Sequence, residues 1–156
     1  MKKTVVVFCT FLFIVSCSKN EISSVTGPDI EQTALTSGSW AKGLTGYTIY
    51  MDGGYATTLF SSSVSSSITT SKITNIRWVW NQLPSGTTTV LLGYTPQYGS
   101  SPTQTMDITS QQNGSTTAFN NLDGRGKISL KFTSTGGTSY PMVRTVKDSI
   151  IENYTY

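Results

Sequence analysis

The octapeptide ITNIRWVW, residues 73–80, is the segment on which the fold prediction depends. It is rich in β-branched and aromatic residues, which favour extended strands. Side chains of a strand alternate between its two faces, so Ile76, Trp78 and Trp80 share one face. Arg77 lies on the opposite face. The pattern predicts a strand with both indoles in a core, as β-sandwiches commonly bury tryptophan. The alternative register exposes the indoles as a platform.

Similar β signals recur about every 8–12 residues from residue 40 onward, the spacing expected of a sandwich or barrel. Residues 127–133, KISLKFT, alternate cleanly and predict Ile128, Leu130 and Phe132 in the core. Asn113-Gly114 is typical of a type I′ turn that leads into a strand. Further strands are predicted at 46–51, 55–60, 87–94, 104–109, 116–119, 140–147 and 150–156, with 61–71 either a weak edge strand or a loop.

The predicted fold class is all-β, because no segment shows a convincing helical pattern. An antiparallel β-sandwich of immunoglobulin-like type fits the strand spacing. A lipocalin-like up-and-down β-barrel is the alternative. The low-complexity stretch at 61–71 and the proline-containing loops favour the uneven connections of a sandwich.

The N-terminus has the pattern of an export signal. Met1-Lys2-Lys3 precedes an apolar run at 4–15, which is shorter than the roughly 20 residues of a membrane-spanning helix. The run ends at Ile14-Val15-Ser16-Cys17, which resembles the lipobox of bacterial lipoproteins. The resemblance implies that a signal peptide of residues 1–16 is removed. It also implies that Cys17 carries diacylglycerol and a further acyl chain such as palmitate, and so anchors the chain to a membrane.

The resemblance places the start of the mature chain at Cys17, and the residue pattern sets the next boundary. Residues 17–39 are predicted to form a lipidated cysteine and a flexible, polar tether, because residues 18–39 have no aromatic residue and no sustained period. Residues 40–156, where the β signals begin, are predicted to form a single β-sandwich domain. Ser18 follows the cysteine, where an inner-membrane retention signal would have aspartate, so the implied location is the cell outer membrane, on either face. Cys9 leaves with the signal peptide, so the mature chain has no thiol pair for a disulfide.

The charge pattern gives no indication of nucleic-acid binding. Without Lys2 and Lys3, nine of the eleven basic side chains remain against eight acidic ones, and they form no basic patch. The sequence contains no histidine, the commonest general base and a common metal ligand. We therefore predict no catalytic residue, no metal site and no cofactor.

Three acids, Asp107, Asp148 and Glu152, fall within predicted strands, and we expect all three to face solvent. Some hydrolases need only a pair of carboxylates, so a carboxylate-dependent hydrolase stays open. It is the least favoured function class, because nothing in the sequence singles out a pair of acids.

Aromatic side chains are the predicted ligand-binding residues. Trp78 and Trp80, in the exposed register, would form one ring platform, and Tyr94 and Tyr98, with Tyr55, would form another. The predicted function is a non-catalytic binding module for a glycan or an envelope-protein partner. The alternative is a structural or adhesive surface component that assembles through sheet edges. Buried indoles and a long unpaired edge favour assembly, whereas an aromatic cleft favours ligand binding.

Overall fold

The computed structural model describes residues 35–45, 47–143 and 146–156. The predicted signal peptide, Cys17 and the tether up to residue 34 lie outside this part of the chain. The described part contains ten strands and no helix, and therefore no helix that could cross a membrane. The strands are β1 (Ser37–Leu44), β2 (Thr48–Ile49), β3 (Tyr55–Ser61), β4 (Lys72–Val79), β5 (Thr87–Thr95), β6 (Gln104–Asp107), β7 (Asn113–Thr116), β8 (Lys127–Thr135), β9 (Met142–Val143) and β10 (Asp148–Thr155).

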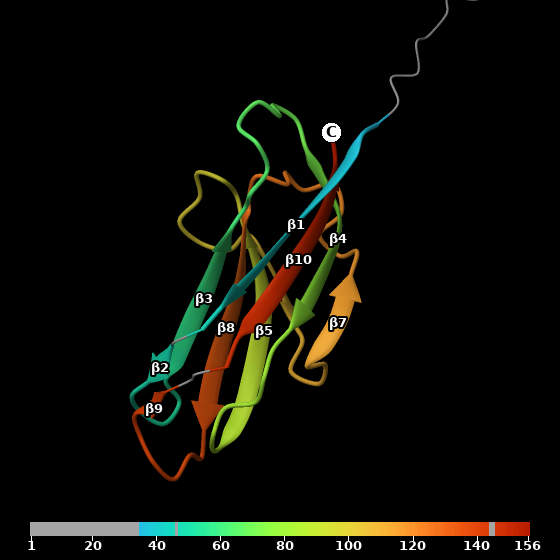
Figure 1. Ribbon diagram of the computed structural model, residues 1–156. Coiled ribbons are helices and arrows are strands. Elements are labelled where there is room, and N and C mark those ends of the chain that lie inside the picture. Colours follow the sequence, from blue (N-terminus) through green and yellow to red (C-terminus); the bar gives the residue numbers. More distant parts are fainter. Residues whose placement is uncertain (1–34, 46, 144–145) are drawn as a thin grey trace, which may run out of the picture. The chain divides into compact units, whose positions relative to one another are not determined.

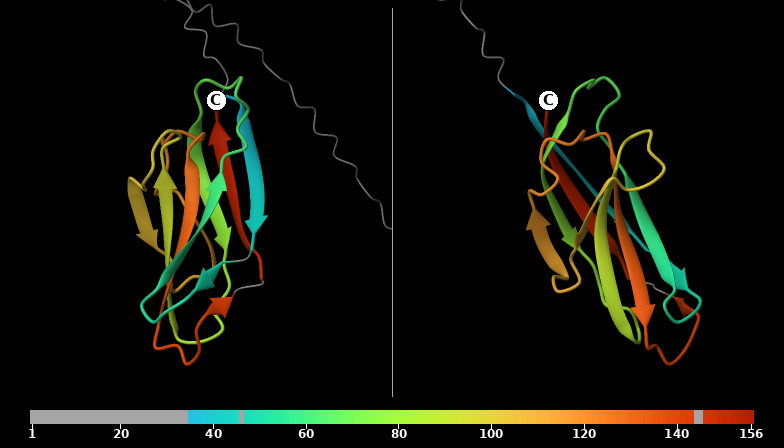
Figure 2. Two further views of the ribbon diagram at one scale, coloured as in Figure 1. Left: turned by 90° about the vertical axis from the view of Figure 1, so that its left-hand side faces the viewer. Right: turned by 180° about the vertical axis from the view of Figure 1, so that it is seen from behind.

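Two four-stranded antiparallel sheets form the two layers of the domain (Figures 1 and 2). One, called here the β10 sheet, has the order β1-β10-β4-β7, and the other, the β8 sheet, has the order β3-β8-β5-β6. Strands β2 and β9 pair at one end of the sandwich. The antiparallel β-sandwich prediction is confirmed. The barrel alternative is wrong, because the strands at the edges of the two sheets do not join them into a closed barrel.

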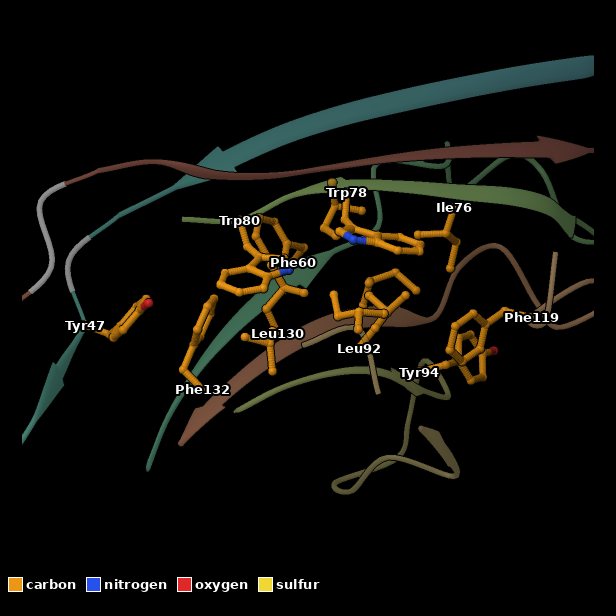
Figure 3. Close-up of a cluster of buried hydrophobic side chains, with 14 of the residues drawn as sticks. Tyr47, Phe60, Ile76, Trp78, Trp80, Leu92, Tyr94, Phe119, Leu130 and Phe132 are labelled. Atoms are coloured by element: carbon orange, nitrogen blue, oxygen red, sulfur yellow. The ribbon is translucent and has the colours of Figure 1, made fainter. Parts of the chain in front are cut away.

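The two indoles come from the inner face of β4, which carries Trp78, and from Trp80, the residue directly after this strand. Trp78 and Trp80 are only 1% and 2% exposed, and they point between the two sheets (Figure 3). Both indole Nε1 groups donate a hydrogen bond of 2.8 Å to the carbonyl oxygen of Gln111. Trp80 also meets the ring of Phe132 edge-on, at 6.3 Å between ring centroids. The prediction that both indoles are buried is confirmed, and the alternative of an exposed indole platform is wrong. Each buried N–H needs an acceptor, and the carbonyl oxygen of Gln111 supplies one for both.

The opposite layer of the core comes from β8 and β5. Ile128, Leu130 and Phe132 are fully buried, as their alternation predicted. Tyr47 stacks on Phe132 with 4.6 Å between ring centroids. Of the strand predicted at 46–51, residue 46 lies outside the described part of the chain, and of residues 47–51 only Thr48–Ile49 is a strand.

The Asn113-Gly114 pair is not a turn but the start of β7, which pairs with β4 so that Gly114 lies opposite Trp78. A Cβ at position 114 would lie 2.5 Å from Cζ2 of Trp78. The glycine is therefore required by the close approach of the strand to the indole rather than by turn geometry. The strand predicted at 116–119 is wrong apart from Thr116, where β7 ends.

Strand β1 begins at Ser37, three residues before the predicted domain boundary. Ser37, Gly38 and Ser39 pair with the end of β10. Thr36 and Tyr156 exchange two further backbone hydrogen bonds of 3.0 and 2.9 Å. The boundary at residue 40 is therefore too late, since an edge strand paired through its backbone needs no apolar alternation in its sequence.

Candidate functional site

A groove of about 620 Å³ lies on the outer face of the β8 sheet, the face that points away from the core. Its volume is within the range of sites for small ligands, roughly 300–1,000 Å³. The groove is lined by Tyr55, Thr57 and Leu59 of β3, Ser129 and Lys131 of β8, Leu91 and Thr95 of β5, Thr105 of β6, and Ser100 and Pro102 of the loop between β5 and β6.

Strand alternation places these side chains together. Phe60 points into the core, so its neighbours at odd positions of β3 point outward. Antiparallel pairing then brings Thr57 beside Lys131, and Lys131 beside Leu91. The next row across the sheet contains Leu59, Ser129, Gly93 and Thr105. The groove floor is thus a continuous surface of side chains from all four strands.

The loop at 96–103 forms one wall of the groove. Its ends are held by the hydrogen bond from Thr103 N to Tyr94 O, 2.9 Å, and Lys127 Nζ donates to Gly99 O at 3.2 Å. The absence of a side chain at Gly93 lets the loop approach the sheet, because a Cβ there would lie 2.7 Å from Ser129 Oγ and 3.4 Å from Pro102 Cβ. Figure 2 (right) shows this loop beside the β8 sheet.

Tyr55 and Lys131 form the most distinctive pair of the groove. The Tyr55 side chain is 65% exposed, an unusual state for an aromatic residue on a sheet face. Lys131 Nζ lies 4.3 Å from its ring centroid, which is cation–π geometry. The remaining polar side chains of the lining are hydroxyls, and none of the ten lining residues carries a carboxyl group. The groove therefore offers a ring, apolar patches and hydrogen-bonding hydroxyls.

The four aromatic residues predicted to bind ligand do not line this groove. Trp78 and Trp80 are in the core, and Tyr94 is 3% exposed, with its hydroxyl donating to Asp123 O at 3.0 Å. Tyr98 is 94% exposed on the loop at 96–103 but is not one of the residues that line the groove. Only Tyr55, the added member of the predicted tyrosine platform, is in the groove.

Sequence reasoning did not identify Lys131 and Ser129 as groove residues, although the signal was present. The alternation of KISLKFT that places Ile128, Leu130 and Phe132 inside requires Ser129 and Lys131 to face outward. Which outward-facing strands become neighbours depends on the sheet order, and the alternation does not contain that order.

The predicted exposure of the three strand acids is correct only for Asp107. Asp148 and Glu152 have no exposed surface. They lie on β10, an interior strand between β1 and β4, and they share its inner face with Ile150 and Tyr154. The adjacent Ile150 and Ile151 make both faces of this strand apolar in sequence, so the inward face could not be identified from the pattern.

Glu152 is a buried carboxyl group inside the sandwich, affected by Trp40 and Asp123. Its Oε1 accepts a 3.1 Å hydrogen bond from Trp40 Nε1. Burial, with a smaller contribution from the negative charge of Asp123, raises the pKa of Glu152 to about 8, against the opposing effect of the Trp40 hydrogen bond. The carboxyl group is thus neutral at neutral pH, the state in which burial is least unfavourable.

The pKa of Asp123 is shifted in the opposite direction, below its ordinary value. Arg125 binds its carboxylate through Nε and Nη2, at 2.8 Å for the closest pair, and these hydrogen bonds lower the pKa of Asp123. Among the described residues, no group of three or more Asp, Glu or Cys side chains is placed to hold a metal ion.

The fold defines the chain as an antiparallel β-sandwich with a groove on one outer face. No protein-family model matches the sequence, and no curated protein matches it. In three dimensions the chain is similar to the protein in a structure described as the crystal structure of FLHE. The match has a TM-score of 0.58 at 17% sequence identity and covers 76% of this chain and 96% of that one. At this identity the similarity concerns the fold alone.

Replacing Glu152→Gln should make the domain more stable at pH 8 while leaving it nearly unchanged at pH 4.5. The folded-state pKa of Glu152 lies above the unfolded value of about 4.3, so the folded state binds this proton more tightly. Its contribution is fully present below about pH 4.3 and is lost as the pH rises toward about 8. The loss has an upper limit of about 1.4 kcal/mol per pH unit.

Urea melts of wild type and variant between pH 4.5 and 8.5 measure this difference. Asp107→Asn is the matched control, because it removes an exposed carboxyl group and should leave the pH dependence of wild type intact over this range. Parallel stability curves for wild type and Glu152→Gln would show that Glu152 ionises normally in the folded protein.

Proposed function

We propose that this chain is a lipid-anchored outer-membrane protein whose β-sandwich binds a glycan in the groove of the β8 sheet without catalysis. The anchor rests on the resemblance of residues 14–17 to a lipobox, which lies outside the described residues. The binding role rests on the groove. Each half of the proposal can fail separately, and each has its own experiment.

The observation that carries the binding role is the exposed ring of Tyr55 at the edge of a groove rich in hydroxyl groups. A sugar ring has apolar C–H faces and polar edges. Tyr55, Leu59 and Leu91 offer surface to the faces, and the hydroxyls of Thr57, Ser100, Thr105 and Ser129 are hydrogen-bonding partners for the edges. Ligand sites in general combine an apolar lining with a few placed polar groups in this way.

The proposal of a non-catalytic role follows from the positions of the acids. Hydrolysis of a glycoside by the usual route needs two carboxyl groups on either side of the bond. No lining residue is an acid, and Asp107 on the adjacent strand uses Oδ1 to accept a 2.8 Å hydrogen bond from Thr109 N. Glu152, with its raised pKa, is inside the core and out of contact with the groove.

Replacing Tyr55→Ala should weaken glycan binding by about tenfold or more, because exposed aromatic side chains at binding sites typically contribute a few kcal/mol. Screening of the purified protein on a glycan array, followed by calorimetry on each hit, measures the change. Tyr50→Ala is the matched control, since Tyr50 is 73% exposed but lies outside the groove. Tyr98→Ala tests the loop platform. Loss of binding in Tyr98→Ala with no change in Tyr55→Ala would locate the site at the loop instead.

Replacing Cys17→Ser should abolish lipidation and leave the precursor uncut, because the thiol is the attachment point for the lipid in a lipobox. Metabolic labelling with an alkyne fatty acid, followed by cell fractionation, measures both effects. Cys9→Ser is the control, since that cysteine precedes the proposed cleavage point. Equal labelling of wild type and Cys17→Ser would remove the anchor from the proposal.

Assembly through sheet edges is a second candidate, favoured by the burial of Trp78 and Trp80 and by the edge strand β3. This seven-residue edge strand, YATTLFS, contains no charged residue and no proline, the residues that usually protect an edge from pairing. If it pairs with another copy, light scattering should detect dimers, and Leu59→Lys should return them to monomers. A wild-type protein that stays monomeric at about 200 μM would exclude this route.

A further inference from the structure

We propose that the groove of the β8 sheet selects acidic glycans, namely saccharides in which a hexose unit carries a carboxylate or sulfate group. In this proposal the Lys131 ammonium binds the anionic group. The inference rests on the proposed function and adds the chemical class of its ligand.

The donor and acceptor balance of the lining is the first argument. Of the ten lining residues, six carry a hydroxyl group, at Tyr55, Thr57, Thr95, Ser100, Thr105 and Ser129. Hydroxyls can donate or accept, and the Lys131 ammonium can only donate. No lining side chain is limited to accepting hydrogen bonds, since the set contains no Asp or Glu. The hydrogen-bond donors of such a groove are best matched by a ligand rich in acceptors. An anionic oxygen group is the strongest acceptor that a sugar can carry.

The position of Lys131 is the second argument. It is the only charged residue among those that line the groove, and it lies on β8, an interior strand, with Thr57 and Leu91 as its neighbours across the sheet. Its ammonium lies 4.3 Å from the centroid of the Tyr55 ring. A hexose packed beside Tyr55 therefore has its substituents within reach of Nζ, so one sugar unit can use the ring and the charge together.

Asp107, the acid in the same cross-strand row as Lys131, does not line the groove. Asp107 shares the row of Lys131 across the sheet, with Leu91 between them. Asp107 is not part of the lining, and its Oδ1 accepts from Thr109 N. Leu91 separates the two charges along the floor, and the ammonium stays directed toward the ring of Tyr55.

Calorimetry with matched ligands tests the inference. The full chain, purified in mild detergent, is titrated with trisaccharides of galacturonate, glucuronate and mannuronate, and with the methyl ester of each, which keeps the ring but lacks the charge. Sulfated and unsulfated galactotriose distinguish sulfate from carboxylate. The variants are Lys131→Met, Lys131→Arg and, as a control that removes the same charge from the outer face of the other sheet, Arg77→Gln.

We expect at least one acidic trisaccharide to bind about tenfold more tightly than its uncharged counterpart, the size typical of a charge-assisted hydrogen bond. Lys131→Met should remove this preference, whereas Lys131→Arg and Arg77→Gln should keep it. The preference should also shrink with added salt. Thermal melts establish that each variant is folded.

Equal binding of acidic and uncharged ligands, or a preference that survives in Lys131→Met, would overturn the inference while leaving the glycan-binding proposal intact. Binding of none of these ligands, together with an empty glycan array, would overturn both.

Discussion

The structure depends on the burial of Trp78, on the inner face of β4, and of Trp80, the residue directly after this strand, with both indole N–H groups bonded to the carbonyl of Gln111. An unbonded N–H in this core would cost about 1–3 kcal/mol, so the shared acceptor makes it possible to bury two large rings side by side. The arrangement also ties the β6–β7 connection, which contains Gln111, to the centre of the β10 sheet. It requires glycine at position 114, where β7 crosses the Trp78 ring.

The groove proposed to bind ligand follows from how the opposite layer completes this core. Phe60, Leu92, Leu130 and Phe132 of the β8 sheet face the indoles and are fully buried (Figure 3). The residues that alternate with them along the strands point to the outer face of the sheet. On this face lie Ser129 and Lys131 of β8 and Tyr55 of β3, and the loop at 96–103 docks over Gly93 to turn an open sheet face into a groove. Asp148 and Glu152 are not part of this surface, because they lie on the inner face of β10.

Local patterns in the sequence were sufficient for the fold class and for most of the core, but only partly for the site. Period-2 alternation in residues 73–80 and 127–133 predicted both layers, since it depends on side-chain direction alone. Strand β1 was missed because an edge strand held by backbone pairing needs no such alternation. The burial of Glu152 was missed because Ile150 and Ile151 are adjacent. The groove joins Tyr55 to Lys131, which are 76 positions apart, and only the pairing of β3 with β8 makes them neighbours.

The most direct test of glycan binding at this groove is a titration followed by NMR. The ¹⁵N-labelled domain, residues 35–156, which forms one compact unit with its own core, is titrated with a glycan that binds on the array. We expect the largest shifts at the amides of Tyr55, Thr57, Ser129 and Lys131 and along the loop at 96–103, with the outer face of the β10 sheet, including Arg77 and Ile151, unchanged. Shifts confined to the β10 sheet or to the β2–β9 end, with none at Tyr55 or Lys131, would contradict a binding site on the β8 sheet.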